Sequence, residues 1–261
     1  MRAVWHIYRR EVGTYFTTPM AYVMMTLFLV LMNIFFFNGV SVFVDNYRQI
    51  QMELQMGRLP PDFNFNATEI IMGRMFGSMS IVMLFLAPMV TMRLFAEENQ
   101  LGTIETLLTC PVRDVEVILG KFLAAMTVFA VLLILTFAYP AFLSFQTSLE
   151  MGPIFTGYLG LLLLAAVFTS VGLFFSSMTE NQIIAAALTF ATLLVLWLTV
   201  AVVQSNMITS GLSAFLRETS LIVRQGSFSE GLIDLGDMVY HLTITAFGLF
   251  LTVNVLDAKV H

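Results

Sequence analysis

The sequence predicts an all-α membrane protein that crosses the bilayer six times. Hydrophobic residues make up 58% of its 261 residues and charged residues only 11%, whereas soluble domains carry about 25% charged residues. The hydrophobic residues gather in six segments, each close to the roughly 20 residues that an α-helix needs to cross the hydrocarbon core. We therefore expect one membrane domain over residues 1–261, with both termini on the same side.

An amphipathic helix is predicted before the first span, within residues 1–18. At about 100° per residue, its hydrophobic side chains fall on one third of the helix surface, and His6, Arg9 and Arg10 lie opposite. This distribution is typical of a helix in the membrane interface, with its rings at headgroup level and its arginines in water. A plain charged leader is the alternative. The hydrophobic positions are Val4, Trp5, Tyr8, Val12, Tyr15 and Phe16.

The predicted spans follow in order. Pro19 opens the first span, and Pro88 predicts a kink in the second. Met75, Met79 and Met83 form a stripe on the second span, which we interpret as helix packing or lipid contact. The six spans cover residues 20–37, 71–95, 122–145, 155–177, 183–203 and 239–256.

A polar interval between the second and third spans, residues 96–118, predicts a folded loop. Four hydrophobic residues recur there at helical spacing, and Thr103 is a candidate N-cap. Pro111 ends this short helix because the residue before a proline disfavours helical geometry. A second helix start follows at Asp114. The hydrophobic residues are Leu101, Ile104, Leu107 and Leu108.

The lysines and arginines favour a cytoplasmic position for the termini and for this loop. Seven lie on that side and five on the other, and the seven concentrate in short segments beside spans. Residues 38–69 and 204–238 then form outer loops, the second with a helix over 212–223. The seven are Arg2, Arg9, Arg10, Arg93, Arg113, Lys121 and Lys259, and the five are Arg48, Arg58, Arg74, Arg217 and Arg224.

The run FAEENQLGTIETLLTCPV, followed by VILGKFLAA, resembles the signature of type-2 ATP-binding cassette (ABC) permeases. The resemblance implies that residues 1–18 are an elbow helix and that the 96–118 loop is a coupling helix seated on a separate ATPase subunit, which binds ATP and Mg²⁺. It also implies a second permease copy or a related membrane subunit. The coupling positions are Glu97, Glu98, Gly102, Thr103, Glu105, Leu107, Leu108 and Pro111, with Gly120 and Lys121 opening the third span.

The end of the chain, SEGLIDLGDMVYHLTITAFGLFLTV, resembles a closing motif of the gliding-motility-associated branch of these permeases. Gly236 stands where that motif usually has a basic residue. The resemblance implies a cell-surface role in a bacterial inner membrane. The matching positions are Gly231, Ile233, Asp234, Asp237, Tyr240 and Phe250.

Several classes of function are disfavoured. No Asp or Glu lies in the middle of a predicted span, as ion-coupled carriers require, and no GxxxxGK[ST] motif is present to bind ATP phosphates. The single cysteine, Cys110, allows neither an internal disulfide nor a cysteine zinc cluster, and no basic patch suits nucleic acid. We therefore expect no catalytic residue, cofactor or metal in this chain.

Two alternatives to an exporter permease stay open. Ser213 and His241 occur in the order of the serine–histidine dyad of rhomboid intramembrane proteases, although we interpret His241 as an interfacial residue. A membrane scaffold that transmits force without moving a solute is the other alternative. For an exporter, the hydrophobic composition suits lipids, lipid-linked polysaccharides, hydrophobic peptides or drugs, and selects none of them.

Overall fold

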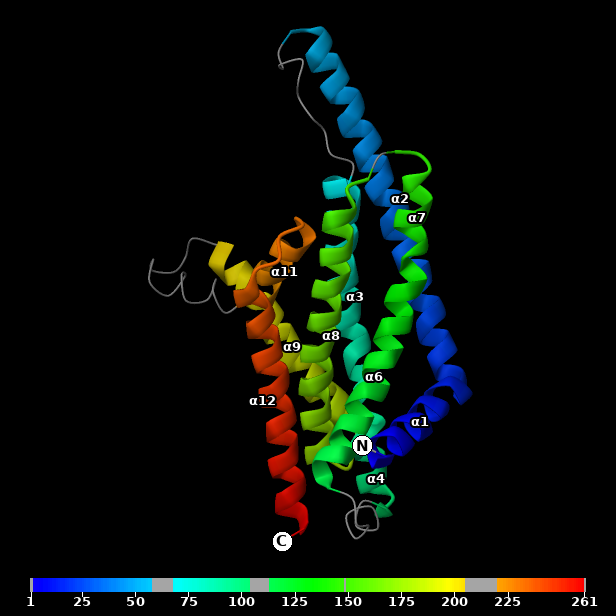
Figure 1. The fold of residues 1–261 in the computed structure, drawn as a ribbon, viewed down its shortest axis with the longest axis vertical. Coiled ribbons are helices and arrows are strands. Elements are labelled where there is room, and N and C mark those ends of the chain that lie inside the picture. The colour runs from blue at the N-terminus through cyan, green and yellow to red at the C-terminus, as the bar shows by residue number, and fades with distance from the viewer. Residues whose placement is uncertain (1, 58–67, 104–112, 148, 205–219, 261) are drawn as a thin grey trace.

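The computed structural model describes residues 2–57, 68–103, 113–147, 149–204 and 220–260. All regular elements within these residues are helical, and six helical segments are long and apolar enough to cross a membrane. The predicted all-α fold with six spans is therefore confirmed. The long helices run side by side, and both termini lie towards the lower end in Figure 1.

Helix α1 (Arg2–Thr17) is the predicted amphipathic helix, and α2 (Pro19–Gln55) is the first span. Thr18 is extended and Pro19 occupies the first turn of α2, where its fixed φ and missing N–H favour a helix start. Helix α2 continues 18 residues past the predicted end of the span, to Gln55, and Gly57 follows it with φ +68°. Residues 38–55 are more polar than the span but contain no proline. Polar residues alone do not end a helix, so α2 continues beyond the hydrophobic segment.

The second span is divided into three helical pieces. A π-helical turn, η1 (Thr68–Met72), leads into α3 (Gly73–Thr91), and α4 (Arg93–Gln100) follows after an interruption at Met92. Pro88 lies inside α3, and the Met92 amide donates to its carbonyl at 2.9 Å. Glu97 and Glu98 therefore belong to the helical extension of the second span. The predicted coupling loop thus begins within a helix, and its role in coupling stays a prediction.

The third and fourth spans are α6 (Asp114–Thr136) with α7 (Ala138–Ser144), and α8 (Met151–Met178). The helix start predicted at Asp114 is confirmed, so the loop ends before residue 118. The third span is interrupted at Phe137, and Pro140 lies inside α7. Helix α8 is the centre of the bundle and contacts α3, α4, α6, α9, α11 and α12.

The remaining helices are α9 (Gln182–Gln204), α11 (Leu221–Ser229) and α12 (Leu235–Val260). The predicted helix over 212–223 is not continuous through Ser220. Ser220 is extended and α11 begins after it, while the earlier part lies outside the described residues. Helix α11 packs against α8, where the Thr156 hydroxyl donates to the Phe228 carbonyl at 2.7 Å.

The hydrophobic core lies between α8 and the helices around it. Met75, Met79 and Met83 are each at most 1% exposed, which confirms their interpretation as packing residues and excludes lipid contact for them. His241 is fully buried, so its interpretation as an interfacial residue is wrong. The reason is that α12 packs against α8 and the His241 ring lies 6.1 Å from that of Phe228 on α11, and the sequence does not show which face of a terminal helix is covered.

Candidate functional site

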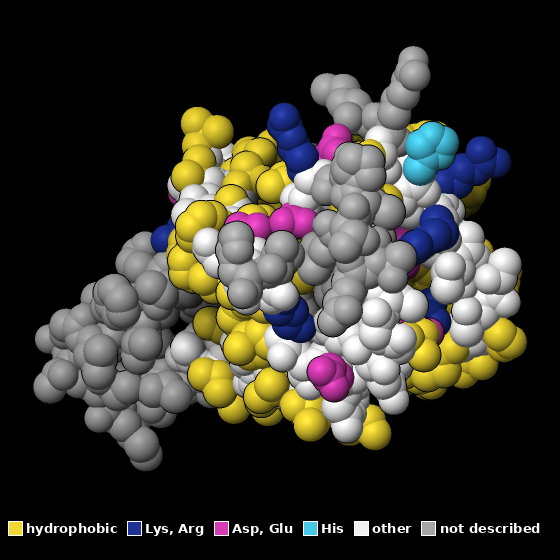
Figure 2. All heavy atoms as spheres, turned by 90° about the horizontal axis from the view of Figure 1, so that it is seen from below, with side chains coloured by type: hydrophobic (Ala, Val, Ile, Leu, Met, Phe, Trp, Pro, Cys, Tyr) yellow, Lys and Arg dark blue, Asp and Glu magenta, His cyan; other side chains and the backbone are white. Residues whose placement is uncertain are grey.

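Helix α4 is the part of the predicted coupling loop that the structure describes best. It lies at the end of the bundle towards which the termini point (Figure 1), and charged side chains of both signs are spread over that end (Figure 2). Leu101 follows α4 with its side chain 68% exposed, and Gly102 has φ +68°, a conformation that favours glycine. The predicted positions Glu105, Leu107, Leu108 and Pro111 lie outside the described residues.

Lys121 on α6 holds α4 from one side. Its side chain is only 1% exposed, and Nζ lies 3.0 Å from Oε1 of Glu11, 3.0 Å from Oε1 of Glu98 and 2.6 Å from the Leu94 carbonyl oxygen. An ammonium group has three N–H donors, so each can meet an acceptor. Nζ also lies 5.1 Å from the centre of the Phe95 ring. The buried charge is therefore neutralised and its hydrogen bonds are made within the protein.

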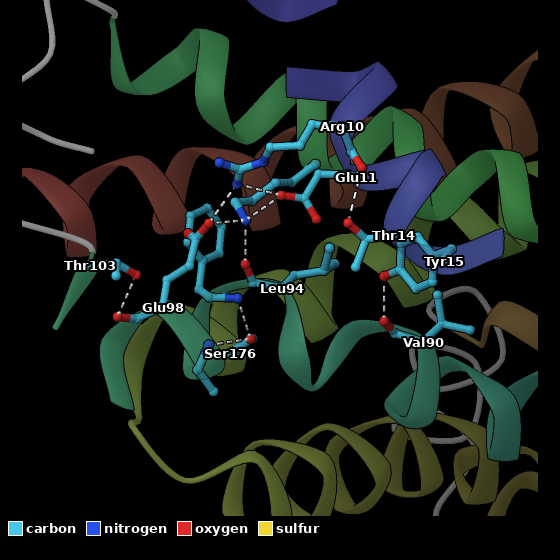
Figure 3. Close-up of polar contacts among 12 residues, drawn as sticks. Arg10, Glu11, Thr14, Tyr15, Val90, Leu94, Glu98, Thr103 and Ser176 are labelled. Atoms are coloured by element: carbon cyan, nitrogen blue, oxygen red, sulfur yellow. Dashed lines mark hydrogen bonds and ion pairs between the residues drawn. The ribbon is translucent and has the colours of Figure 1, made fainter. Parts of the chain in front are cut away.

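Arg10 on α1 completes what we call the ionic cluster: Arg10, Glu11, Glu98 and Lys121. Figure 3 shows Arg10, Glu11 and Glu98 close together. Nη2 of Arg10 lies 2.9 Å from Oε1 of Glu11 and 2.8 Å from Oε1 of Glu98. The Arg10 side chain is 57% exposed, whereas Glu98 is 17% exposed. Two positive and two negative groups thus join α1, α4 and α6. Glu98 faces this cluster, while Glu97 on the neighbouring position is exposed.

The carboxyl group of Glu11 stays ionised in the ionic cluster. Burial, the largest single influence, raises its pKa, but the Lys121 charge and the hydrogen bonds from Arg10 and Lys121 together lower the pKa below its ordinary value of 4.5. The hydrogen bond to Glu11 is also the main cause that raises the pKa of Arg10. Each partner therefore favours the charged form of the other.

Gly120 lets α1 approach α6 at the ionic cluster. A Cβ atom at this position would lie 2.8 Å from Cγ2 of Ile7 and 3.2 Å from the Val4 carbonyl oxygen. Real Cβ atoms essentially never lie as close to another atom as the 2.8 Å to Ile7, so a larger residue would force α1 to shift. The Gly-Lys pair of the sequence signature therefore has two structural roles, since Gly120 brings α1 close and Lys121 binds its Glu11.

Ser176 on α8 caps the start of α4 from a neighbouring helix. Its Oγ accepts the amides of Phe95 and Ala96 at 3.0 and 3.1 Å and donates to the Met92 carbonyl at 2.9 Å. The first turn of a helix has amides without helical partners, and α4 has no cap from its own N-cap side chain. Ser176 thus stabilises the junction between α3 and α4.

Asn99 fixes the far end of α4. Its Nδ2 donates to the Thr179 carbonyl at 3.1 Å, and its Oδ1 accepts from Nζ of Lys259 on α12 at 3.1 Å. Tyr15 on α1 adds a contact at the end of α3, where its hydroxyl donates to the Val90 carbonyl at 2.6 Å. Helix α4 is therefore connected by polar contacts to α1, α6, α8 and α12.

The closing motif has a structural role of its own. Nη1 of Arg224 lies 2.6 Å from Oδ1 of Asp237, and its guanidinium lies 4.3 Å from the centre of the Tyr240 ring. Arg224 on α11 thus supplies a basic partner for Asp237, although the motif has Gly236 between its aspartates. Nδ1 of His241 lies 2.8 Å from the Asp237 carbonyl oxygen. Ser213 lies outside the described residues, so the protease dyad is untested.

Comparison with protein families identifies the class of the chain. The family described as ABC-2 family transporter protein matches residues 5–228, which include most of α1 and α11 and all of the ionic cluster and α4. The chain belongs to this family, whose members are membrane components of transporters and have no nucleotide-binding domain of their own. A comparison with curated proteins finds no match.

The contacts of the site fix the position of α4 against its neighbouring helices. In the part of the chain that the structure describes, no group of three or more His, Cys, Asp or Glu is placed to hold a metal ion. The charged groups of the ionic cluster pair with one another, whereas Glu97 on α4 and Leu101 and Gly102 just after it are exposed. Sequence reasoning did not find Glu11, Ser176, Asn99 or Lys259. A carboxylate beside the hydrophobic face of the amphipathic helix was the signal for Glu11.

Proposed function

We propose that this chain is the permease subunit of an ATP-driven exporter and that α4, with the residues that follow it, docks on a separate ATPase subunit. The observation that carries this proposal is that polar contacts connect α4 to α1, α6, α8 and α12. Glu97 on α4 and Leu101 directly after it are exposed. Membership of the ABC-2 transporter family supports the proposal. ATP and Mg²⁺ bind to the ATPase in this proposal.

Coupling follows from the continuity of α4 with the second span. A movement of the ATPase pushes α4, and α3 moves with it because only Met92 separates the two helices. The ionic cluster passes the same movement to α1 and to the base of α6. Packed helices move as rigid bodies between discrete arrangements, so this motion switches access to a transport pathway.

The proposed assembly contains a second permease copy or a related membrane subunit and lies in a bacterial inner membrane with cytoplasmic termini. Helix α9 exposes large hydrophobic side chains, including Ile183, Leu188 and Val195, which suit lipid or a second subunit. The role in a gliding or other cell-surface machine stays a prediction from the closing motif. A reporter fused to the carboxyl end tests the orientation, and periplasmic activity of that reporter would contradict it.

The docking proposal is tested by purification from the native membrane in mild detergent through a carboxy-terminal tag. We expect a nucleotide-binding ATPase in stoichiometric amount with the wild type and its loss with Glu97→Lys, because this change reverses an exposed charge on α4. Glu53→Lys is the matched control, since Glu53 is exposed in the last turn of α2, and α2 ends at the opposite end of the molecule from α4 (Figure 1). Wild-type protein that purifies without an ATPase would contradict the proposal.

A further inference from the structure

A groove of about 600 Å³ lies between α1 and α6, where α1 packs against the lower part of α6 (Figure 1). The groove is open to the outside of the bundle, since Trp5 is 59% exposed and Leu123 is 45% exposed. We call it the α1 groove. Its lining includes Trp5 and Tyr8 from α1, Leu119, Leu123 and Ala130 from α6, and Leu162 from α8.

The lining of the α1 groove is almost entirely hydrophobic. Its hydroxyl groups belong to Tyr8 and Thr127, whose oxygen atoms lie 3.1 Å apart and bond to each other. No charged side chain is among its described lining residues. A hydrocarbon chain therefore suits this groove, whereas a polar ligand would find few groups to bind.

The length of the α1 groove matches one leaflet of a bilayer. Leu119 and Ala130 lie about 16 Å apart along α6, at about 1.5 Å per residue. This distance is about half of a hydrocarbon core that is roughly 30 Å thick. Because α6 belongs to a predicted span, the groove is long enough to hold an acyl chain through one leaflet.

One end of the α1 groove carries groups that suit a lipid headgroup. Helix α1 crosses α6 beside Gly120, at the same end as Leu119. There the Trp5 ring stacks on the Tyr8 ring with 5.3 Å between their centres, and such amphipathic rings favour the headgroup level of a bilayer.

Arg9 supplies a positive charge at this end. It follows Trp5 by four residues, so the two side chains are neighbours on the surface of α1. Arg9 is exposed and makes no ion pair or hydrogen bond with the residues that the structure describes, whereas Arg10 is bound in the ionic cluster. With three arginines and one glutamate in α1, the charge of this helix complements an anion.

We propose that the α1 groove binds an anionic glycerophospholipid, with one acyl chain along α6 and the phosphate group beside Arg9. The bound lipid holds α1 against α6, next to the ionic cluster. The inference goes beyond the proposed exporter function and does not rest on it, because all lining residues belong to this chain.

Quenching of tryptophan fluorescence by brominated lipids tests the proposal. The chain has two tryptophans, so Trp197→Phe leaves Trp5 as the sole reporter. The purified variant is placed in phosphatidylcholine vesicles that contain increasing fractions of brominated phosphatidylglycerol or, separately, of brominated phosphatidylcholine. We expect the anionic lipid to quench Trp5 at an about fivefold lower fraction, which is the effect of one arginine near an anionic headgroup.

Equal quenching by the two brominated lipids would overturn the proposal, because the groove would then take any lipid. Absence of quenching by either lipid would also overturn it. That result is expected if a second copy of the chain covers the groove and shields Trp5.

Two changes in the Trp197→Phe background locate the binding. Arg9→Gln should abolish the preference for the anionic lipid, whereas Arg48→Gln, an exposed arginine on the outer part of α2, should retain it. Ala130→Phe fills the groove and should weaken quenching by both lipids, whereas Ala138→Phe, at an exposed position outside the lining, should not. An unaltered preference in Arg9→Gln, or unaltered quenching in Ala130→Phe, would refute the site.

The outcome is separate from that of the docking test. A preference for the anionic lipid in a permease that purifies without an ATPase would retain the α1 groove as a lipid site and reject the exporter assembly. An ATPase that co-purifies with a permease lacking this preference would do the reverse.

Discussion

Lys121 shows how one residue can hold an interface of three helices. Its ammonium group is buried, and the acceptors that surround it come from α1 and α4. Removing one partner of a buried ion pair leaves the others uncompensated. By contrast, Arg10 is more than half exposed, so solvent screens its contacts and they contribute little to stability.

We therefore expect Lys121→Met to destabilise the protein by about 3–5 kcal/mol and Arg10→Met by about 1 kcal/mol or less. Thermal unfolding of the purified permease in detergent measures both. Replacing the two carboxyl groups as well, in Lys121→Met with Glu11→Gln and Glu98→Gln, should recover part of the loss. Equal effects of the two single changes would show that burial does not distinguish the two cations.

The lowered pKa of Glu11 predicts that the stability of the protein depends on pH. Because its pKa is lowered in the folded protein, it binds fewer protons there than in the unfolded chain at acidic pH. The stabilisation is complete above the ordinary value of 4.5 and is lost as the pH falls through the lower, folded value. We expect the melting temperature to fall at acidic pH more steeply in the wild type than in Glu11→Gln, and parallel curves would contradict this role.

At the scale of helices, α4 depends on a cap from α8. The Ser176 hydroxyl accepts hydrogen bonds from two α4 amides and donates one to the Met92 carbonyl. The neighbouring Ser177 hydroxyl donates to the Phe174 carbonyl in its own helix. We expect Ser176→Ala to cost about 1–2 kcal/mol and to speed amide exchange in α4. Ser177→Ala is the matched control and should leave α4 exchange unchanged. Equal exchange in the two variants would show that α4 needs no external cap.

The contact between α1 and α6 depends on Gly120. Gly120→Ala places a methyl group against Ile7, and overpacking of this kind typically costs about 1–3 kcal/mol. We expect lower thermal stability in Gly120→Ala and partial recovery when Ile7→Ala is added. Gly13→Ala in α1 is the control, because a Cβ atom there meets no atom within 4 Å. A Gly120→Ala protein as stable as the wild type would contradict the close approach.

The helices were more predictable than their junctions. Hydrophobicity alone located all six spans, since each must cover the hydrocarbon core. It did not show that α2 extends to Gln55 or that Glu97 and Glu98 extend the second span. Both extensions have polar surfaces outside the hydrophobic segments, and hydropathy does not distinguish a polar helix from a loop.

At the scale of the whole molecule, the site arises where distant parts of the chain meet. Glu11, Glu98 and Lys121 are far apart in sequence, so their pairing required the fold. The signature placed Glu97 and Glu98 together as docking residues, whereas the structure gives them different surroundings. Glu98 is paired inside the bundle, and Glu97 is exposed. We infer that Glu98 positions α4 and that Glu97 faces the ATPase.

Site-specific photo-cross-linking from α4 tests this account most directly. A benzoylphenylalanine at position 97, introduced in cells of the native host, should form a covalent adduct with a nucleotide-binding ATPase upon irradiation. The same group at position 53, in the last turn of α2 and so at the opposite end of the molecule from α4 (Figure 1), should form none. Absence of an ATPase adduct from position 97 in protein that reaches the membrane, or equal adducts from both positions, would contradict the assignment of α4 as the docking helix.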